Sequence, residues 1–221
     1  MVKKILRVGV LNNFNHTDAE IVHANQLGKK WNVFVNSNAK TPIRFGPAVV
    51  TINPDLDKFI EPSGDITKIS AVRIKVVADP KLSVDKAMTD AYTWASTKGI
   101  PVLLTAMRFT SEDMMKQYTK SPKLYKWDKN YYRLKEWSDI TVPAGAFFCD
   151  EKHLGCPTCK NCAKLTYNEP DAEIYGINLS ESGKCPFNCP GCFAKKCLAM
   201  TKTKTPLYDK PFQNKKQKGA M

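Results

Sequence analysis

The clearest fold signal in the chain lies in residues 71–107, which read AVRIKVVADPKLSVDKAMTDAYTWASTKGIPVLLTAM. The apolar run 71–78 predicts a buried strand, which stops near Pro80 because proline cannot donate to a sheet ladder. Ser83 is a predicted helix cap, and apolar residues follow it at helical spacing until a glycine and a proline end the helix. Residues 101–107 form the next predicted strand. A crossover of this length joins parallel strands with right-handed chirality, which indicates an α/β sheet or barrel.

The sequence on both sides of this unit continues the alternation of strands and helices. Further strands are predicted near residues 5–11, 31–35 and 48–52, a helix near 17–28, and a helix from a cap at Ser111 to about Tyr118. Ligands of parallel sheets lie beyond the carboxyl ends of the strands, where the polar residues here are Asn36, Asn38, Asn53, Asp79 and Arg108. Polar residues after strands also form ordinary turns, so these five are positions of interest rather than an assigned site.

The charge of the chain points to an anionic partner. With 221 residues it can form one domain with a real core, or a domain and a small module. The formal net charge of +13 favours partners such as nucleic acid or a phosphorylated substrate. The charge is uneven, because eight lysines from Lys195 to Lys218 face a single acid, Asp209. We expect this tail to be either a solvated end or a nucleic-acid contact.

The N-terminal apolar run is short, ending at Asn12-Asn13, and it lacks the core and the cleavage site of a signal peptide. No later stretch has the length of a membrane span. The expected location is therefore the cytoplasm, with no membrane partner. In that reducing compartment, closely spaced thiols are more often metal ligands or redox groups than disulfides.

The eight cysteines divide the chain by composition. Residues 1–140 contain none and form the predicted α/β domain. Residues 141–200 are turn-rich and hold all eight thiols, and residues 201–221 form the basic tail. The predicted fold is therefore an α/β protein with a partial, barrel-like parallel sheet and a C-terminal cysteine-rich metal-binding region.

The first group of thiols comprises Cys149, Cys156, Cys159 and Cys162. In the last three, two residues separate each cysteine from the next, and this spacing brings several sulfurs toward one centre. Cys149 can return from the preceding loop as another ligand. Overlapping Cys-x-x-Cys steps occur in ferredoxin-type 4Fe–4S sites, while four thiolates also complete a structural zinc site. We favour the cluster and keep zinc as the alternative. His153 lies between these thiols and is a weaker ligand candidate.

The second group lies in residues 185–193, CPFNCPGCF, and is followed by Cys197. Three and then two residues separate Cys185, Cys189 and Cys192, a spacing that resembles the cluster loop of the radical S-adenosylmethionine superfamily. The resemblance implies a 4Fe–4S cluster on these three thiolates, with one iron left to bind S-adenosylmethionine. It also implies that an electron from a donor breaks a carbon–sulfur bond and releases a deoxyadenosyl radical. If Cys197 is a fourth ligand, the cluster is closed and serves electron transfer or structure.

The order of the motifs differs from that of the superfamily, in which the cluster loop follows the first barrel strand. Only 29 residues follow Cys192, so the barrel strands must lie upstream, in a permuted order. With residues 72–107 and the 156–162 group, the motif resembles radical-SAM-like phage proteins of the gene product 88 family, which implies the host cytoplasm as the location. The chain also lacks a Gly-Gly-Glu segment. Three functions stay open: a radical S-adenosylmethionine enzyme of unknown substrate, a non-enzymatic iron–sulfur protein, and a zinc protein that contacts nucleic acid.

Overall fold

The computed structural model describes residues 4–9, 13–54, 58–128, 130–136, 139–140, 146–148, 161–169 and 173–177. Its strands are β1 (Lys4–Val8), β2 (Asn32–Asn38), β3 (Ala48–Ile52), β4 (Ile69–Val76), β5 (Val102–Ala106), β6 (Tyr125–Asp128), β7 (Tyr131–Leu134), β8 (Phe147–Phe148) and β9 (Glu173–Ile177). Its helices are α1 (Asp18–Gly28), α2 (Leu82–Thr97), α3 (Glu112–Tyr118) and α6 (Asn161–Tyr167), with short 3-10 turns η1 (Ile66–Lys68) and η2 (Pro122–Leu124). None of the helices in these ranges is both long enough and apolar enough to cross a bilayer.

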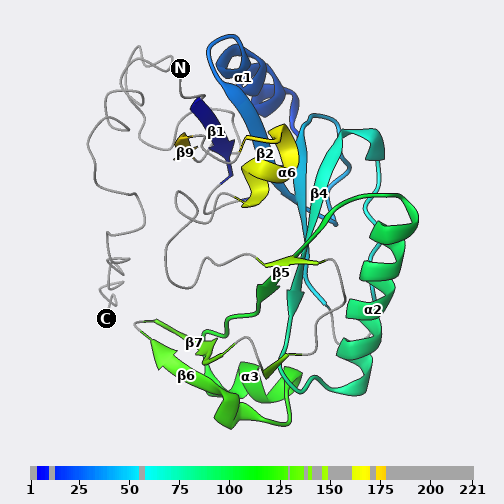
Figure 1. Ribbon diagram of the computed structural model, residues 1–221, viewed down its shortest axis with the longest axis vertical. Coiled ribbons are helices and arrows are strands. Elements are labelled where there is room, and N and C mark those ends of the chain that lie inside the picture. Colours follow the sequence, from blue (N-terminus) through cyan, green and yellow to red (C-terminus); the bar gives the residue numbers. More distant parts are fainter. Residues whose placement is uncertain are drawn as a thin grey trace, which may run out of the picture. The chain divides into compact units, whose positions relative to one another are not determined.

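Seven strands form one parallel sheet in the order β8-β5-β4-β3-β2-β1-β9, and β6 and β7 form a separate antiparallel hairpin (Figure 1). Strands β1 to β5 are neighbours in chain order, so the sheet winds in one direction and curls into a half-barrel. The predicted α/β class with a partial parallel barrel is confirmed at this level. Most of the cysteine-rich region lies outside the described residues.

Helices contact the sheet on both of its faces, as is usual for parallel sheets. In Figure 1, α2 runs along one side of β4 and β5, and α6 lies on the other side of β4. We call the side that faces α6 the inner face. On the outer side, Ile74 and Val76 line a cavity of about 340 Å³ together with Met88 and Tyr92 of α2. The helix buries Val84, Ala87 and Ala91, as the helical spacing of 84–95 predicts.

The predicted elements of the 71–107 unit are present with shifted ends. The strand predicted at 71–78 is β4, which begins two residues earlier and ends at Val76. Val77 and Ala78 are buried instead in a second cluster with Phe109 and Met115, beyond the carboxyl end of β4. The next strand is β5, and the other strands and helices predicted upstream of it match β1, β2, β3 and α1 to within a few residues.

The start of α2 corrects the prediction that Ser83 caps it. The N-cap is Lys81, whose backbone is extended (φ −65°, ψ 150°) and whose side chain makes no capping hydrogen bond. The N–H of Lys81 donates to the carbonyl of Tyr118 at 3.2 Å. Because this bond fixes the chain just before the helix, Ser83 falls inside the first turn. The cap predicted at Ser111 is confirmed, since its hydroxyl accepts from the N–H of Met114 at 3.1 Å.

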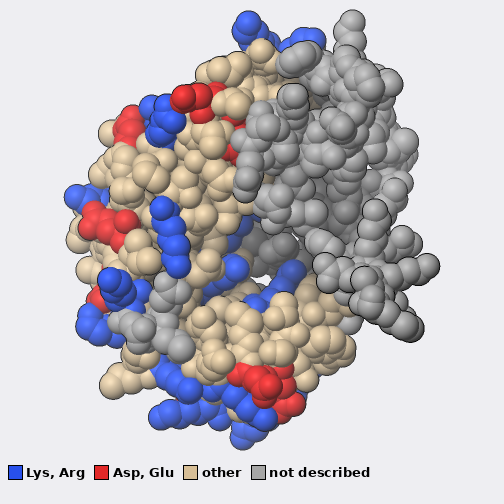
Figure 2. All heavy atoms as spheres, turned by 180° about the vertical axis from the view of Figure 1, so that it is seen from behind, with Lys and Arg blue, Asp and Glu red and all other residues tan. Residues whose placement is uncertain are grey.

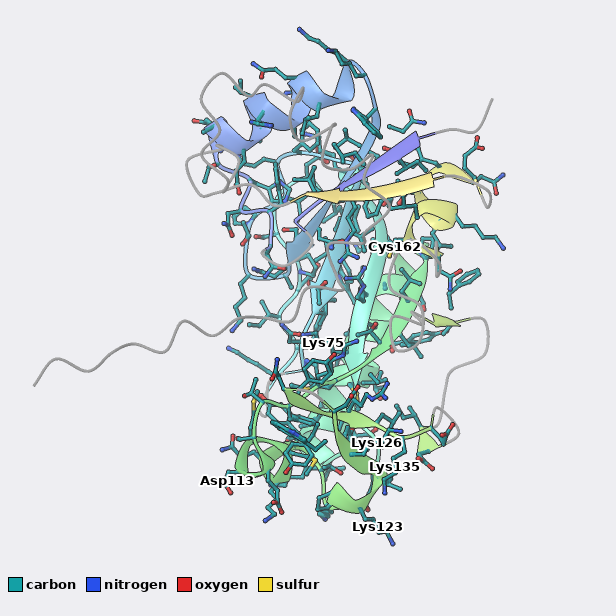
Figure 3. The ribbon with its side chains drawn as sticks, turned by 90° about the vertical axis from the view of Figure 1, so that its left-hand side faces the viewer. Lys75, Asp113, Lys123, Lys126, Lys135 and Cys162 are labelled. Carbon is teal, nitrogen blue, oxygen red and sulfur yellow. The ribbon has the colours of Figure 1, made fainter. Side chains whose placement is uncertain are left out.

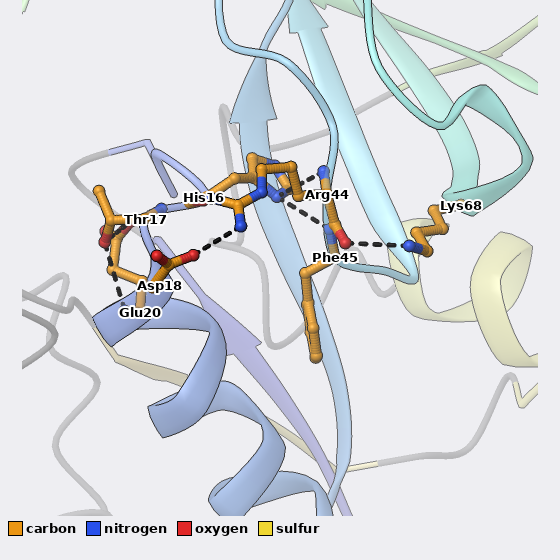
Figure 4. Close-up of polar contacts among 7 residues, drawn as sticks. All are labelled: His16, Thr17, Asp18, Glu20, Arg44, Phe45 and Lys68. Carbon is orange, nitrogen blue, oxygen red and sulfur yellow. Dashed lines mark hydrogen bonds and ion pairs between the residues drawn. The ribbon is translucent and has the colours of Figure 1, made fainter.

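A buried histidine joins the start of α1 to the segment after β2 (Figure 4). The ring of His16 is 1% exposed, and its Nδ1 accepts from the N–H groups of Arg44 at 3.3 Å and Phe45 at 3.1 Å. Nε2 therefore carries the proton and donates to the Ser37 hydroxyl at 3.1 Å. Burial, reinforced by the charges of Arg44 and Lys68, lowers the pKa of His16 from 6.5 to about 4. His16 is thus a neutral, structural group rather than a surface residue.

The predicted cysteine-rich region supplies β8 and β9 to the same sheet as the upstream strands, and α6 to its inner face. β8 pairs with β5 at one edge, and β9 pairs with β1 at the other. Both pairings are parallel. The described part of residues 141–200 is therefore built into the α/β sheet.

Candidate functional site

An apolar layer lies on the inner face of the sheet at the level of α6. Five strands and α6 contribute one residue each, namely Ile5, Phe34, Val49, Ala71, Leu103 and Cys162. Each of these side chains is at most 7% exposed. The C-terminal end of α6 lies near the start of β4, because the hydroxyls of Ser70 and Thr166 are 2.9 Å apart. The helix therefore covers the interior from the amino-terminal side of the strands.

A polar layer follows, two residues further along each strand. Alternate side chains of a strand point to the same face, so these residues also belong to the inner face. They are Arg7, Asn36, Thr51, Arg73 and Thr105, and each is at most 9% exposed. Lys75 lies two residues after Arg73 on β4, in register with Thr105 of β5. Two arginines and a lysine thus face the interior, and none of these six residues is acidic.

Two buried oxygens of the polar layer, Asn36 Oδ1 and Thr105 Oγ1, have no hydrogen-bond partner among the residues that the structure describes. The Asn36 amide nitrogen donates to the carbonyl of Gly9 at 3.1 Å, which fixes that side chain. A buried polar atom without a partner costs about 1–3 kcal/mol. The layer therefore offers hydrogen-bonding groups as well as positive charge, a combination that suits a polar, anionic ligand.

Cys162 is the predicted metal ligand that the structure describes. It is the second residue of α6 and is 7% exposed. Nη2 of Arg73 donates to its sulfur at 3.0 Å. A guanidinium in this position can offset the negative charge of a metal-bound thiolate. The last member of the first cysteine group therefore lies inside the curled sheet, beside the polar layer.

The remaining predicted ligands lie outside the described residues. They are Cys149, Cys156, Cys159, Cys185, Cys189, Cys192 and Cys197, together with His153. Within the part of the chain that is described, no group of three or more His, Cys, Asp or Glu side chains is arranged to hold a metal ion. The grouping of the cysteines into metal centres therefore stays a prediction from their spacing.

The five polar residues predicted at the strand ends have different roles. Asn36 belongs to the polar layer. Arg108 lies over a tyrosine ring of the hairpin at 4.7 Å. Asn38 accepts from the N–H two residues on at 2.8 Å, and Asp79, at φ 47°, accepts from a serine hydroxyl, so both shape turns. Asn53 is exposed. One of the five is therefore part of the inner face.

Sequence reasoning missed the cations of the inner face. In β4 the alternation of Val72, Arg73, Ile74 and Lys75 is also the pattern of a half-exposed strand whose charges face water. A parallel sheet is covered on both faces, so the same alternation turns the charges inward. The available signal was the presence of alternating cations in a strand predicted to be parallel and central.

The polar layer lies nearer the carboxyl ends of the strands than the apolar layer does. The face shown in Figure 2 is hollowed near its centre, with Lys and Arg side chains beside the hollow. In Figure 3, Lys75 lies between Cys162 and the β6–β7 hairpin. The hairpin meets this end of the sheet, because Tyr125 of β6 accepts from the N–H of Ala78 just beyond β4, at 2.9 Å.

Comparison with known proteins adds no assignment. The inner face and the cysteine spacing are therefore the basis on which a function can be inferred. No family model matches this chain, and no curated protein or solved structure shows significant similarity to it.

Proposed function

We propose that this chain is a radical-SAM-like iron–sulfur protein. In this proposal Cys185, Cys189 and Cys192 hold a 4Fe–4S cluster with one open iron. Cys149, Cys156, Cys159 and Cys162 hold a second centre. When bound, the open cluster supplies the one-electron reductive cleavage of S-adenosylmethionine. The substrate is not assigned, and the tail from Lys195 onward is proposed as a nucleic-acid contact.

The observation that carries the proposal is the position of β9. This strand lies beside β1 at the edge of the sheet, with Ile174 in register with Ile5. Read from that edge, the strand order is β9, β1, β2, β3, β4, β5 and β8. Cys185 follows the end of β9 by eight residues. The cysteine motif thus comes after the first strand of the spatial series, as the resemblance to the superfamily implies.

The late position of the motif in the chain is consistent with this proposal. All strands of a parallel sheet end at the same side, and loops at that side form the sites of such folds. The last described strand, β9, is first in the spatial series, so it too ends at that side. The permuted chain order is therefore compatible with a cluster at the mouth of the curled sheet.

The charges of the inner face support the same proposal. Thiolate-bound iron–sulfur centres and the carboxylate of S-adenosylmethionine are negatively charged, and Arg7, Arg73 and Lys75 face the interior. Arg73 already donates to the sulfur of Cys162. Hydrogen bonds and positive charge near cluster sulfurs are the means by which proteins tune such centres. The described residues thus fit a negatively charged cofactor.

Metal analysis of protein purified without oxygen tests the proposal against the zinc alternative. We expect brown protein with iron and acid-labile sulfide in about equal amounts, as a 4Fe–4S cluster requires. Colourless, fully folded protein with stoichiometric zinc would reject the iron–sulfur proposal and leave the zinc-binding function.

Cysteine variants then separate an open from a closed second centre. Alanine at Cys185, Cys189 or Cys192 should remove one cluster, while Cys197→Ala serves as the matched control and should retain it. S-adenosylmethionine should perturb the electron paramagnetic resonance spectrum of the reduced protein and of this control. If the ligand leaves the spectrum unchanged and Cys197→Ala destroys the centre, the cluster is closed, and the protein is a non-enzymatic iron–sulfur protein.

A further inference from the structure

The β6–β7 hairpin carries charges and aromatic rings that the inner face does not use. Residues 119–136 contain six basic residues, namely Lys120, Lys123, Lys126, Lys129, Arg133 and Lys135, against the two acids Asp128 and Glu136. We propose that this hairpin, together with turn η2, is a binding surface for single-stranded nucleic acid. The surface is distinct from the lysine-rich tail and does not depend on a metal.

The end of the hairpin that meets the sheet is buried, and this fixes the hairpin in place. Tyr125 and Leu134 are cross-strand partners, and both are buried in the cluster that contains Phe109. Phe109 and Tyr132 exchange two backbone hydrogen bonds, of 3.0 and 2.7 Å. The hydroxyl of Tyr125 accepts from the N–H of Ala78 at 2.9 Å. The outer half of the hairpin is therefore presented on a rigid support, which lowers the entropy cost of binding.

Trp127 supplies an exposed stacking surface. Its side chain is 53% exposed, although indole is large and apolar. Its cross-strand partner is Tyr132, and the two ring centroids are 4.9 Å apart with an interplanar angle of 66°. Tyr132 therefore orients the indole while leaving much of it open. Bases stack on such rings whatever their sequence, and in a single strand their faces are accessible.

The adjacent cross-strand pair, on the opposite face of the hairpin from Trp127, brings two cations together, Lys126 and Arg133. Like charges directly opposite each other destabilise a sheet, so the stability of the hairpin does not explain why two cations stand at these positions. Asp128 offsets part of the repulsion through its 2.9 Å contact with Nε of Arg133. Arg108 adds a further cation over the ring of Tyr131 at 4.7 Å. An anion along this strand pair would relieve the repulsion.

Three exposed lysines extend the charge. Lys123, Lys126 and Lys135 lie at the hairpin end of the molecule in Figure 3. Nζ of Lys135 donates to the carbonyl of Lys123, so these two residues are neighbours. Figure 2 shows Lys and Arg side chains, with some acids, gathered at this end of the molecule. Separate lysines match a phosphate backbone, because each can neutralise one phosphate and release its counterion.

The combination of features favours nucleic acid over other anionic partners. A purely electrostatic contact would not require an exposed indole. An anionic membrane would be met by an amphipathic face with several apolar anchors, whereas Trp127 is the strongly exposed large apolar residue in the described part of the hairpin. Trp127 and Lys126 alternate along β6, the edge strand of the hairpin, so a single strand that crosses this edge can stack a base on one face and place phosphates at the other.

Fluorescence anisotropy with the full chain tests the stacking contact. The probes are labelled dodecamers of thymidine and of uridine, with a duplex of the same length for comparison. Trp127→Ala should weaken single-strand binding about five- to 150-fold, the effect of losing one stacked base. Trp127→Phe should retain most of the affinity. Leu82→Ala is the matched control, because it removes another exposed apolar side chain, 83% exposed, at the start of α2.

A triple variant tests the phosphate contacts. Lys123→Ala/Lys126→Ala/Lys135→Ala should reduce the slope of log K against log salt by about 2, because each phosphate contact on a single strand contributes about 0.7. The control Lys30→Ala/Lys58→Ala/Lys98→Ala removes the same charge from exposed positions elsewhere and should keep the slope. Circular dichroism establishes that each variant is folded.

Several results would overturn the proposal. One is an equal loss of binding in the two triple variants, which would assign binding to net charge, including that of the tail. Another is wild-type affinity of the folded Trp127→Ala variant. A third is tighter binding to the duplex, or to vesicles that contain phosphatidylserine, than to the single strands.

Discussion

Mild acid should destabilise this fold through His16, because the folded protein keeps that imidazole neutral. Nδ1 accepts two backbone N–H groups and Nε2 donates to Ser37, so a second ring proton would have to displace both acceptor contacts. The pKa of His16 is lowered from 6.5 to about 4. Between these two values the unfolded chain binds the proton that the folded chain excludes. Stability from this group is therefore complete above the unfolded pKa and is lost as the pH falls toward the folded one.

The size of the effect follows from the shift in pKa. From 6.5 to about 4, at about 1.36 kcal/mol per unit, the full contribution of His16 is about 3.4 kcal/mol. At pH 5 the loss relative to pH 7 is about 2 kcal/mol. A loss of this size is a large part of the stability of an ordinary domain.

Urea unfolding of the full chain at pH 7 and pH 5 measures this loss. The variant His16→Asn removes the titrating group, and asparagine tolerates the left-handed backbone of this position, φ 58°. We expect the stability difference between the two pH values to shrink by about 2 kcal/mol in His16→Asn. His23→Gln, which removes the imidazole of α1, is the comparison variant for the loss of a histidine. Equal acid sensitivity of the wild type and His16→Asn would refute the assignment of the effect to His16.

Four further substitutions test the packing and the proposed metal site. Gly64→Ala should lower the free energy of unfolding by at least about 1–3 kcal/mol in thermal unfolding, because φ is 86° and a Cβ would lie 2.5 Å from the backbone of Ile43. Gly99→Ala is the comparison. It should cost less, because at φ 65° its Cβ would enter open space. Tyr125→Phe should cost about 1–3 kcal/mol, since it leaves the buried N–H of Ala78 without its acceptor. Arg73→Met should speed iron release to a chelator, and unchanged release would argue against a centre at Cys162.

The strand–helix–strand unit could be predicted from sequence because its signals are local. The apolar run of β4, the helical spacing of α2 and the terminating glycine and proline act within a few residues of one another. The N-cap of α2 could not be predicted, because the chain there is fixed by a hydrogen bond from Lys81 to Tyr118, a residue that follows β5. Long-range contacts of this kind leave no periodic signal.

The elements that matter most for the site are short and lie among turn residues. α6 has seven residues and β9 has five, and both lie in a segment that is rich in cysteine, glycine and proline. The hairpin strands have four residues each and are joined by Lys129 and Asn130, without the glycine that marks the commonest two-residue turns. Tertiary packing, through Ile174, Cys162 and Tyr125, decides these elements more than local propensity does.

The late strand β9 shows why chain order is a weak constraint on this site. Closing a loop costs an entropy that grows only with the logarithm of its length, about 0.6 kcal/mol for each doubling. Pairing the last described strand with the first therefore costs little more free energy of loop closure than pairing strands that are neighbours in sequence. What the pairing must satisfy is register, because a slip of one residue would exchange the two faces of β9 and take Ile174 away from the apolar layer. Once Ile174 packs beside Ile5, β9 ends at the same side of the sheet as β1 and the other parallel strands. The contact, rather than the position in the chain, decides on which side β9 ends.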